Sequence, residues 1–265
     1  MLAKRLLTAA VAIPLVLAII AYGGSLGIFL LVLVVVGLSL YEYFSFIYPQ
    51  KINIQIIAHT ILGLLLPVAF YFGYPDLVVP AIAFIIIFAT AFALFRVTDP
   101  QRKAENLFIR LFGIFYVAFL LSYLIVLRKL PHGAEWVVVA IAINFGTDAG
   151  AYFAGRLFGK HPLYPVISPK KTVEGAIGGV VFCVLLLIGV KYVFFTIMTW
   201  PDVLILGMVA SILAVLGDMA ESLIKRGFKV KDAGGLLPGH GGFLDRIDSF
   251  VFSAPFIFYY VLHRL

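Results

Sequence analysis

The chain has 265 residues, of which 63% are hydrophobic and only 12% are charged. Soluble globular domains carry about 25% charged residues, so this composition excludes a soluble protein. Each membrane-spanning helix needs about 20 apolar residues, which leaves room for about nine or ten such helices and for no separate soluble domain. The single cysteine, Cys183, excludes an intramolecular disulfide and a cysteine-based metal site.

Uncharged apolar stretches, bounded by glycine, proline, charged or turn residues, predict nine membrane-spanning helices in an all-α protein. They cover 6–22, 26–46, 54–72, 77–94, 107–127, 136–158, 173–195, 203–224 and 247–262. The first stretch follows Lys4 and Arg5, as in a signal peptide, but no small-residue cleavage site comes after it. We therefore expect an uncleaved first span.

The distribution of basic residues predicts the orientation, because cytoplasmic loops of membrane proteins are enriched in lysine and arginine. With nine spans the two termini lie on opposite sides of the membrane. The N-terminal side would carry Lys4, Arg5, Lys51, Arg96, Arg102, Lys103, Arg156, Lys160, Lys170, Lys171, Lys225, Arg226, Lys229, Lys231 and Arg246. The other side would carry only Arg128, Lys129, Lys191 and Arg264. We expect the N-terminus in the cytoplasm and the C-terminus on the opposite side.

The two halves of the chain differ in their polar residues. Residues 1–133 contain about five predicted helices with few ionisable groups, chiefly Glu42 and Arg110, and this half is interpreted as a scaffold. Residues 134–265 contain about four helices in which acidic and amide side chains interrupt apolar stretches. An ionisable group at the bilayer centre costs about 2.5–3.5 kcal/mol on insertion scales and usually marks a functional cavity. The active region is therefore expected in the second half.

Asn144 and Asp148 lie four residues apart, on one face of the sixth predicted helix. Gly146, Gly150 and Ala154 form a series of small residues at the same spacing, which indicates close packing against another helix. Packing does not explain the charge of Asp148. Asp148 and its neighbour Asn144 are therefore candidates for substrate or cation contacts, with interhelical hydrogen bonding as the alternative.

The loop that follows contains Ser168, Lys170 and Lys171 just before the next helix. Two interpretations remain open for it. It is either a basic cytoplasmic loop that touches anionic lipid, or a phosphate-binding mouth assisted by the N–H groups at the start of the helix. A nucleotide-binding P-loop at 155–160 is excluded, because Ala154 stands at its first glycine position and His161 at its serine or threonine position.

The eighth predicted helix ends with Asp218, Glu221, Ser222 and Lys225 on one face, followed by Arg226. An ion pair would explain part of this pattern. It would not explain the lysines and glycines that come next.

Lys229 and Lys231 lead into a segment, 234–242, that contains five glycines and a proline. Glycine lets a backbone approach a ligand closely. Asp245 and Asp248 then share a face of the last helix, within reach of Asp218 if the last two helices pack as a hairpin. Carboxylates, a basic rim and a glycine loop together are suited to holding Mg²⁺ against phosphate oxygens, so we expect a phosphorylated substrate.

The stretch from Ser222 to Asp248 contains SLIKR, then KD, then LLPGHGGFLDRID, and it resembles the signature of the phosphatidate cytidylyltransferase (CDP-diacylglycerol synthase) family. The block SPKKTVEG at 168–175 and the stretch 144–148 are also similar to that family. The resemblance covers about residues 144–249. The first half is similar only as a hydrophobic region with several spans.

The resemblance implies an integral-membrane enzyme that joins CTP to phosphatidate and releases pyrophosphate, with Mg²⁺ required. It implies metal ligation by Asp218 and Asp245, with Asp248 as a further ligand, and a second cation such as K⁺ in some members. The remaining candidates for phosphate contacts are basic or lie in the same motifs. They are Lys225 and Arg226 near the reacting groups, and Asn144, Asp148, Ser168, Lys170, Lys171, Ser222, Lys229, Lys231, His240 and Arg246 for substrate binding. His240 alternatively supports the glycine loop.

Two other functions fit parts of the pattern. A CTP-dependent polyprenol kinase would share the basic, Mg²⁺-dependent mouth but release CDP, and a membrane transporter would also place Asp148 and Asp218 inside the membrane. A CDP-alcohol phosphotransferase is disfavoured, because the Asp218 and Asp245 regions lack the Asp-x-x-Asp-Gly spacing. We expect a multi-pass protein of a bacterial-type inner membrane, with its active site facing the cytoplasm and surrounded by lipid. No nucleic-acid partner is expected, and the small-residue faces are compatible with a homodimer.

Overall fold

The computed structural model describes residues 2–48, 54–95, 99–235 and 241–264, with side chains from residue 10 onwards. The chain divides into two compact units. One comprises Met1–Lys129 and Asp232–Leu244, and the other comprises Leu130–Lys231 and Asp245–Leu265. The sequence predicts a division between residues 133 and 134. The structure differs in grouping the segment 232–244 with the first unit, where its end is hydrogen-bonded to Glu42 of an N-terminal helix.

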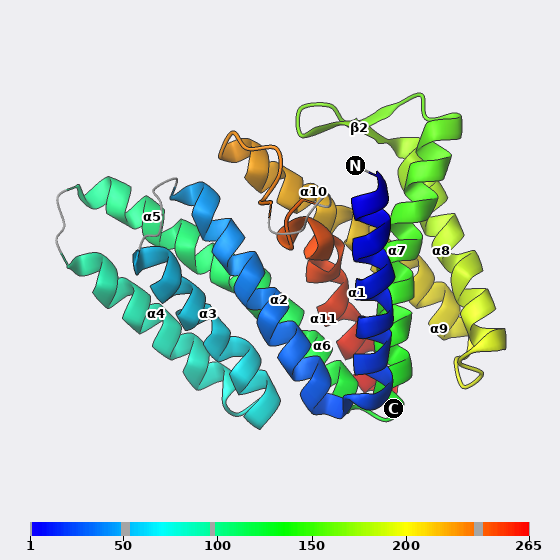
Figure 1. The fold of residues 1–265 in the computed structure, drawn as a ribbon, viewed down its shortest axis with the longest axis horizontal. Helices are drawn as coiled ribbons and strands as arrows, with labels where there is room; N and C mark the ends of the chain where they lie inside the picture. The colour runs from blue at the N-terminus through cyan, green and yellow to red at the C-terminus, as the bar shows by residue number, and fades with distance from the viewer. Residues whose placement is uncertain (1, 49–53, 96–98, 236–240, 265) are drawn as a thin grey trace. The chain divides into compact units, whose positions relative to one another are not determined.

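The first unit is built from helices (Figure 1). They are α1 (Leu2–Tyr22), α2 (Gly24–Ile47), α3 (Ile54–Gly73), α4 (Val78–Leu94), α5 (Pro100–Gly113), the π-helical turn η1 (Ile114–Phe119) and α6 (Leu120–Lys129). The last three form one continuous helix, Pro100–Lys129. It begins before the expected residue 107, because Asp99 caps it by accepting the N–H of Arg102 at 3.2 Å and Pro100 occupies the first turn.

The core of the first unit lies where α2 packs on α3 and α6. Leu40, Phe44, Leu66 and Phe70 are fully buried there. Dispersion contacts rather than charge therefore hold these helices together.

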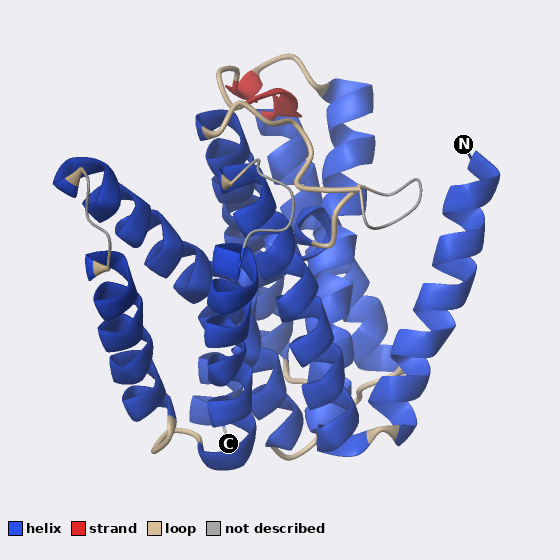
Figure 2. Cartoon of the chain, turned by 60° about the vertical axis from the view of Figure 1, so that its left-hand side comes forward, coloured by secondary structure: helices blue, strands red, loops and turns tan. Residues whose placement is uncertain are grey.

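The second unit contains helices and one short strand pair (Figure 2). Its elements are α7 (Gly133–Phe158), β1 (Pro162–Tyr164), β2 (Ser168–Thr172), α8 (Val173–Val193), α9 (Trp200–Ile205), the π-helical turn η2 (Leu206–Ala210), α10 (Ser211–Gly227) and α11 (Leu244–Arg264). The strands form an antiparallel ribbon in which Pro162 faces Thr172 and Tyr164 faces Ser168. The sequence predicts only a loop here, because such short strands of mixed polarity carry no alternating pattern.

Helices α7 and α8 run side by side (Figure 1). A Cβ atom added at Gly150 would lie 2.5 Å from Cβ of Phe182, and one added at Gly146 would lie 2.6 Å from Leu186. Such distances are far below van der Waals contact, so only glycine permits this separation. The predicted small-residue packing of this helix face is confirmed.

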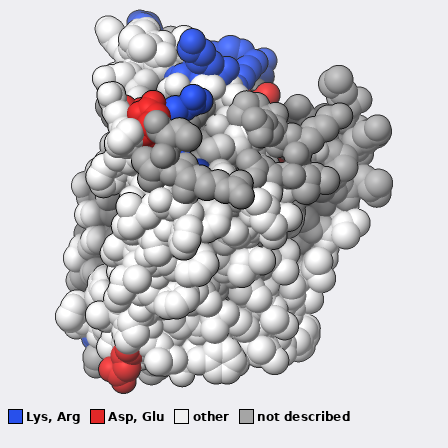
Figure 3. All heavy atoms as spheres, turned by 90° about the vertical axis from the view of Figure 1, so that its left-hand side faces the viewer, with Lys and Arg blue, Asp and Glu red and all other residues white. Residues whose placement is uncertain are grey.

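Six helices of the described chain are long and apolar enough to cross a membrane. They are Gly24–Ile47, Ile54–Gly73, Pro100–Lys129, Gly133–Phe158, Val173–Val193 and Trp200–Gly227. Shorter apolar helices cover Ala10–Tyr22 and Val78–Leu94. On the face drawn in Figure 3, a wide band between the charged ends carries almost no lysine, arginine, aspartate or glutamate. The protein is an all-α, multi-pass membrane protein with one small ribbon.

Candidate active site

Helices α10 and α11 approach one another at Gly217. A Cβ atom there would lie 2.5 Å from the main-chain oxygen of Asp248, so a side chain larger than hydrogen would separate the two backbones. The close approach brings together three carboxylates, Asp218 and Glu221 from α10 and Asp248 from α11. One oxygen of each lies within 4.8 Å of the others. The hairpin-like contact expected for the last two helices is confirmed.

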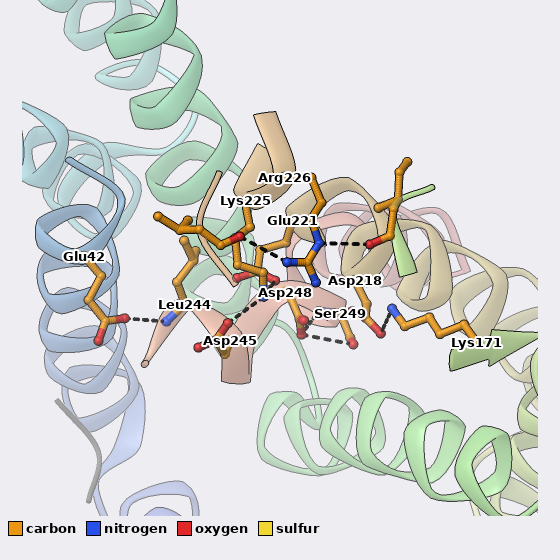
Figure 4. A network of polar contacts seen from close by, with 12 residues as sticks. Glu42, Lys171, Asp218, Glu221, Lys225, Arg226, Leu244, Asp245, Asp248 and Ser249 are labelled. Atoms are coloured by element: carbon orange, nitrogen blue, oxygen red, sulfur yellow. Dashed lines mark hydrogen bonds and ion pairs between the residues drawn. The ribbon is translucent and has the colours of Figure 1, made fainter. Parts of the chain in front are cut away.

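Lys225 lies beside this three-carboxylate group, one turn after Glu221 on α10 (Figure 4). Its Nζ atom is 2.5 Å from Oε2 of Glu221 and 2.6 Å from Oδ1 of Asp245. The side chains of Glu221, Lys225 and Asp245 are only 1%, 12% and 13% exposed. One ammonium group therefore bridges two carboxylates in a largely buried setting, where charge pairs interact more strongly than at a surface.

Lys171 reaches the same group from the ribbon, because its Nζ forms an ion pair with Oδ2 of Asp218. Ser249 connects the group to α7. Its hydroxyl donates to Oδ1 of Asp148 at 3.4 Å and to Oδ1 of Asp248 at 3.3 Å, and its backbone N–H donates to Asp248 at 2.7 Å. Asp148 is thus joined to the three-carboxylate group through a serine hydroxyl.

Acidic side chains outnumber basic side chains at this site. The carboxylates of Asp218, Glu221, Asp245 and Asp248, with Asp148 beside them, are contacted by the ammonium groups of Lys171 and Lys225. Arg246 adds a further positive charge near Asp148. Carboxylates this close repel one another, and a bound cation offsets that repulsion. Carboxylate oxygens are also the ligands that hard divalent cations such as Mg²⁺ prefer, so the three-carboxylate group fits such an ion.

The ribbon that carries Lys171 is held by side chains from α8 and α10. Glu174 at the start of α8 accepts the backbone N–H groups of Lys160 at 3.0 Å and His161 at 3.2 Å. Arg226 on α10 donates from Nε to the carbonyl oxygen of Ile167, between the strands, at 3.2 Å. Lys171 is therefore presented on a fixed support.

The family model described as the Cytidylyltransferase family matches residues 3–263. This chain belongs to the cytidylyltransferase family. The resemblance seen in residues 222–248 is thereby confirmed, and the match extends over the N-terminal helices as well.

Curated relatives carry the name phosphatidate cytidylyltransferase. The protein from Staphylococcus saprophyticus is 45% identical over 148 residues, covering 56% of this chain and 56% of the relative. The Bacillus subtilis protein is 41% identical over 145 residues, covering 54% of each. A Staphylococcus aureus protein is 38% identical over 176 residues, covering 64% of this chain and 66% of the relative. The chain thus spans little more than half the length of the first two relatives.

Asn144 does not join the three-carboxylate group. Its amide nitrogen donates to the carbonyl oxygen of Ala140 at 2.8 Å, and its amide oxygen accepts the hydroxyl of Ser253 at 3.0 Å. Asn144 is 1% exposed. Of the two alternatives considered for this residue, its contacts support interhelical hydrogen bonding between α7 and α11.

Helix α10 ends in a turn that sets the position of Lys229. The N–H of Val230 donates to Lys225 at 2.9 Å and the N–H of Lys229 donates to Arg226 at 3.0 Å, the hydrogen-bond pattern of a Schellman motif. Lys229 has φ of 58°, where glycine is the usual residue. Lys229 remains a predicted phosphate contact.

The other candidates for substrate binding lie at exposed or half-buried positions. Lys170, Lys231 and Arg246 are exposed, and Ser168 and Ser222 are half-buried. His240 lies outside the described residues. The exposed lysines and arginine remain predicted phosphate contacts.

The structure adds contacts for two carboxylates that the sequence alone did not specify. Asp245, predicted to ligate metal beside Asp218, is paired with Lys225. Glu221, which was not among the predicted ligands, takes a place beside Asp218 and Asp248. Glu221 lies three residues after Asp218 on one helix face, which could have indicated a shared cation site. It also lies four residues before Lys225, and that spacing equally suits an ion pair.

Proposed function

We propose that this protein is a phosphatidate cytidylyltransferase, which converts CTP and phosphatidate to CDP-diacylglycerol and pyrophosphate. The observation that carries the proposal is the group formed by Asp218, Glu221 and Asp248 in a membrane protein of the cytidylyltransferase family. The names of its curated relatives support the same activity.

Asp218, Glu221 and Asp248 would hold a divalent cation such as Mg²⁺. When bound, such a cation supplies positive charge that neutralises the triphosphate and favours displacement at phosphorus. The family resemblance also implies Asp245 as a ligand and a second cation such as K⁺. Lys225 already supplies one positive charge between Glu221 and Asp245.

The chain's own cations would bind the phosphates. Lys171 is fixed beside Asp218, and Lys225 is fixed beside Asp245, so both ammonium groups can be shared between a carboxylate and a phosphate oxygen. Lys170, Lys229, Lys231 and Arg246 would add exposed positive charge that attracts both anionic substrates. Arg226 would act mainly by holding the ribbon.

In the reaction, an oxygen of the phosphatidate phosphate attacks the α-phosphorus of CTP in line with the leaving pyrophosphate. One phosphorus–oxygen bond forms and the bond between the α-phosphorus and its bridging oxygen to the β-phosphate breaks. The attacking phosphate is already an anion, so no strong general base is required. The residues of the site act by positioning and by electrostatic stabilisation, which dominate catalysis of such transfers.

We further propose nine membrane crossings, with the N-terminus and the active site on the cytoplasmic side of a bacterial-type inner membrane. The nine predicted spans each correspond to a helical segment of the described chain, and the basic residues favour one side. Reporter fusions at the loops 74–77 and 130–132 test this orientation, since both loops are expected outside the cytoplasm.

The activity is tested with purified protein in mixed micelles containing CTP, Mg²⁺ and phosphatidate. Pyrophosphate release that depends on phosphatidate, with CDP-diacylglycerol identified by mass, is the expected result. Asp76→Asn is the control for replacing an aspartate of the site by asparagine, because Asp76 is an exposed aspartate in the turn between α3 and α4. This variant should react at the wild-type rate.

Two outcomes would overturn the proposed function. Release of CDP with a polyprenol would assign the protein to the kinase alternative. Binding of lipid without consumption of CTP would favour the transporter.

A further inference from the structure

Glu42 is a buried carboxylate in α2, far along the chain from the three-carboxylate group. It is 2% exposed and lies within the apolar helix Gly24–Ile47. An ionisable residue in a membrane-spanning helix is costly and usually has a function. The described contacts of Glu42 indicate what that function is.

The Glu42 carboxylate contacts the first residue of α11. Its Oε2 atom accepts the backbone N–H of Leu244 at 3.0 Å, across 202 residues of sequence (Figure 4). Leu244 is the first residue of α11 and is 1% exposed. The first N–H groups of a helix have no partner within the helix, and negative charge is favourable at that end. Glu42 therefore stabilises a helix that begins at Leu244.

Two glycines of the segment 232–244 lie directly against the same carboxylate. A Cβ atom added at Gly234 would lie 2.7 Å from Cδ of Glu42, and one added at Gly242 would lie 2.9 Å from that atom. The backbone on both sides of residues 236–240 thus packs around one carboxylate, and a Cβ atom at either glycine would require that carboxylate to shift. This contact also explains why the segment groups with the N-terminal helices.

We propose that Glu42 is a positioning residue for the active site. It fixes the residue at which α11 begins, and thereby the places of Asp245 and Asp248, which follow Leu244 in the first turns of that helix. The expected effect of Glu42 on catalysis rests on the proposed function, whereas its expected effect on cation binding does not. It also gives the N-terminal scaffold a specific part in catalysis.

The test compares Glu42→Ala and Glu42→Gln with Ser39→Ala. Ser39 is a matched control, because it lies three residues earlier on α2 and is 0% exposed. The first measurement is thermal unfolding of the purified variants over a range of Mg²⁺ concentrations, without CTP or lipid. We expect Glu42→Ala to need about tenfold more Mg²⁺ than wild type for the same stabilisation, as for other residues that orient metal ligands. Glu42→Gln, which keeps an acceptor oxygen, should recover part of the loss, and Ser39→Ala should match wild type.

The second measurement is the rate of CDP-diacylglycerol formation. Glu42→Ala should lower kcat by about 10- to 100-fold, with a smaller change in the KM for CTP, because displaced groups lose the reactive geometry. In a double-mutant cycle, Gly242→Ala should cost less in the Glu42→Ala background than in wild type, since the clash is with the carboxylate.

The outcomes separate this inference from the proposed function. A wild-type protein that makes no CDP-diacylglycerol contradicts the proposed function, while the Mg²⁺ titration still tests Glu42. Equal Mg²⁺ midpoints for wild type and Glu42→Ala, or a wild type that does not respond to Mg²⁺, would overturn the positioning role. An equal loss in Ser39→Ala would do the same, because it would indicate general damage to α2.

Discussion

Two polar clusters that lie within the helices of this protein differ in the groups that surround their charged side chains. In the second unit, Asp218, Glu221 and Asp248 place three like charges within 4.8 Å of one another. In the first unit, Arg110 is 6% exposed and its hydrogen-bonding partners are neutral.

All three nitrogen atoms of the Arg110 guanidinium have a polar contact. Its Nε donates to the hydroxyl of Tyr48, its Nη2 donates to the amide oxygen of Gln55 at 3.0 Å, and its Nη1 lies 3.5 Å from Nε2 of His59. The guanidinium also stands 4.9 Å from the ring centre of Tyr48. Hydrogen bonds and the aromatic face together stabilise this buried cation.

This difference indicates that one cluster stabilises the fold and that the other is suited to binding a cation. Arg110 is contacted by neutral polar groups of the protein itself, so we interpret its cluster as stabilising the fold. A nearby cation offsets the repulsion within a group of carboxylates, so the three-carboxylate group is suited to binding one. Variants of the three-carboxylate group should therefore affect activity, and variants of the Arg110 cluster should affect folding stability.

The largest expected effect is on catalysis, from Asp218→Asn and Asp248→Asn. Each should lower kcat by about 10²–10³-fold, the usual effect of removing one group that stabilises transition-state charge. The unfolding temperature of Asp248→Asn without divalent cation should stay the same or rise, because a neutral amide removes repulsion between carboxylates. Asp218→Asn loses its ion pair with Lys171 as well, so its unfolding temperature should be lower than that of Asp248→Asn. Steady-state kinetics and thermal unfolding check the two parts. Full activity in both variants would remove these aspartates from the site.

Gly217→Ala should damage the three-carboxylate group indirectly. Its methyl group would meet the main-chain oxygen of Asp248, an atom that moves only with the helix. We expect a loss of about 1–3 kcal/mol in the free energy of unfolding, as for other overpacked sites, together with loss of activity.

Gly227→Ala is the control for Gly217→Ala on the same helix, because a Cβ atom at Gly227 meets nothing within 4 Å. It should keep wild-type activity. Denaturant unfolding in detergent and the CDP-diacylglycerol assay compare the pair. Equal behaviour of the two variants would show that close approach at Gly217 is not required.

The Arg110 cluster should respond in stability alone. Arg110→Met removes the charged donor and leaves Gln55 and His59 without it, so we expect the free energy of unfolding to fall by about 1.5–3 kcal/mol. The kcat of the folded protein should be unchanged. Thermal unfolding with activity normalised to folded protein measures both. A variant with normal stability and lost activity would place Arg110 in the reaction and reverse the comparison.

The smallest expected effect concerns Lys229 at the end of α10. Lys229→Gly should raise the free energy of unfolding by about 1 kcal/mol, because glycine adopts positive φ without the steric cost that other residues pay. Lys229→Ala should bring no such gain. If the side chain contacts phosphate, both variants should raise the KM for CTP equally. Thermal unfolding and CTP titrations distinguish backbone from side-chain effects, and an unchanged KM in both would leave Lys229 outside substrate binding.

The helix α10 shows how far sequence patterns reach. Its apolar stretch predicted a span over 203–224, and its polar face placed Asp218, Glu221 and Lys225 together. The pattern could not decide which carboxylate Lys225 would contact, since Glu221 and Asp245 were both available. The structure shows that Lys225 contacts both.

Hydrophobicity and helical spacing are local properties of the chain. They alone determined the membrane-spanning character, the approximate positions of the helices, the small-residue face of α7 and a set of candidate site residues. Pairing of distant residues was decided only by tertiary structure. The approach of α10 and α11 at Gly217, the ion pair of Lys171 with Asp218 and the hydrogen bond from Leu244 to Glu42 all depend on how helices pack. Many packings bury the same apolar faces, so contacts between residues as much as 202 positions apart leave no periodic pattern in the sequence.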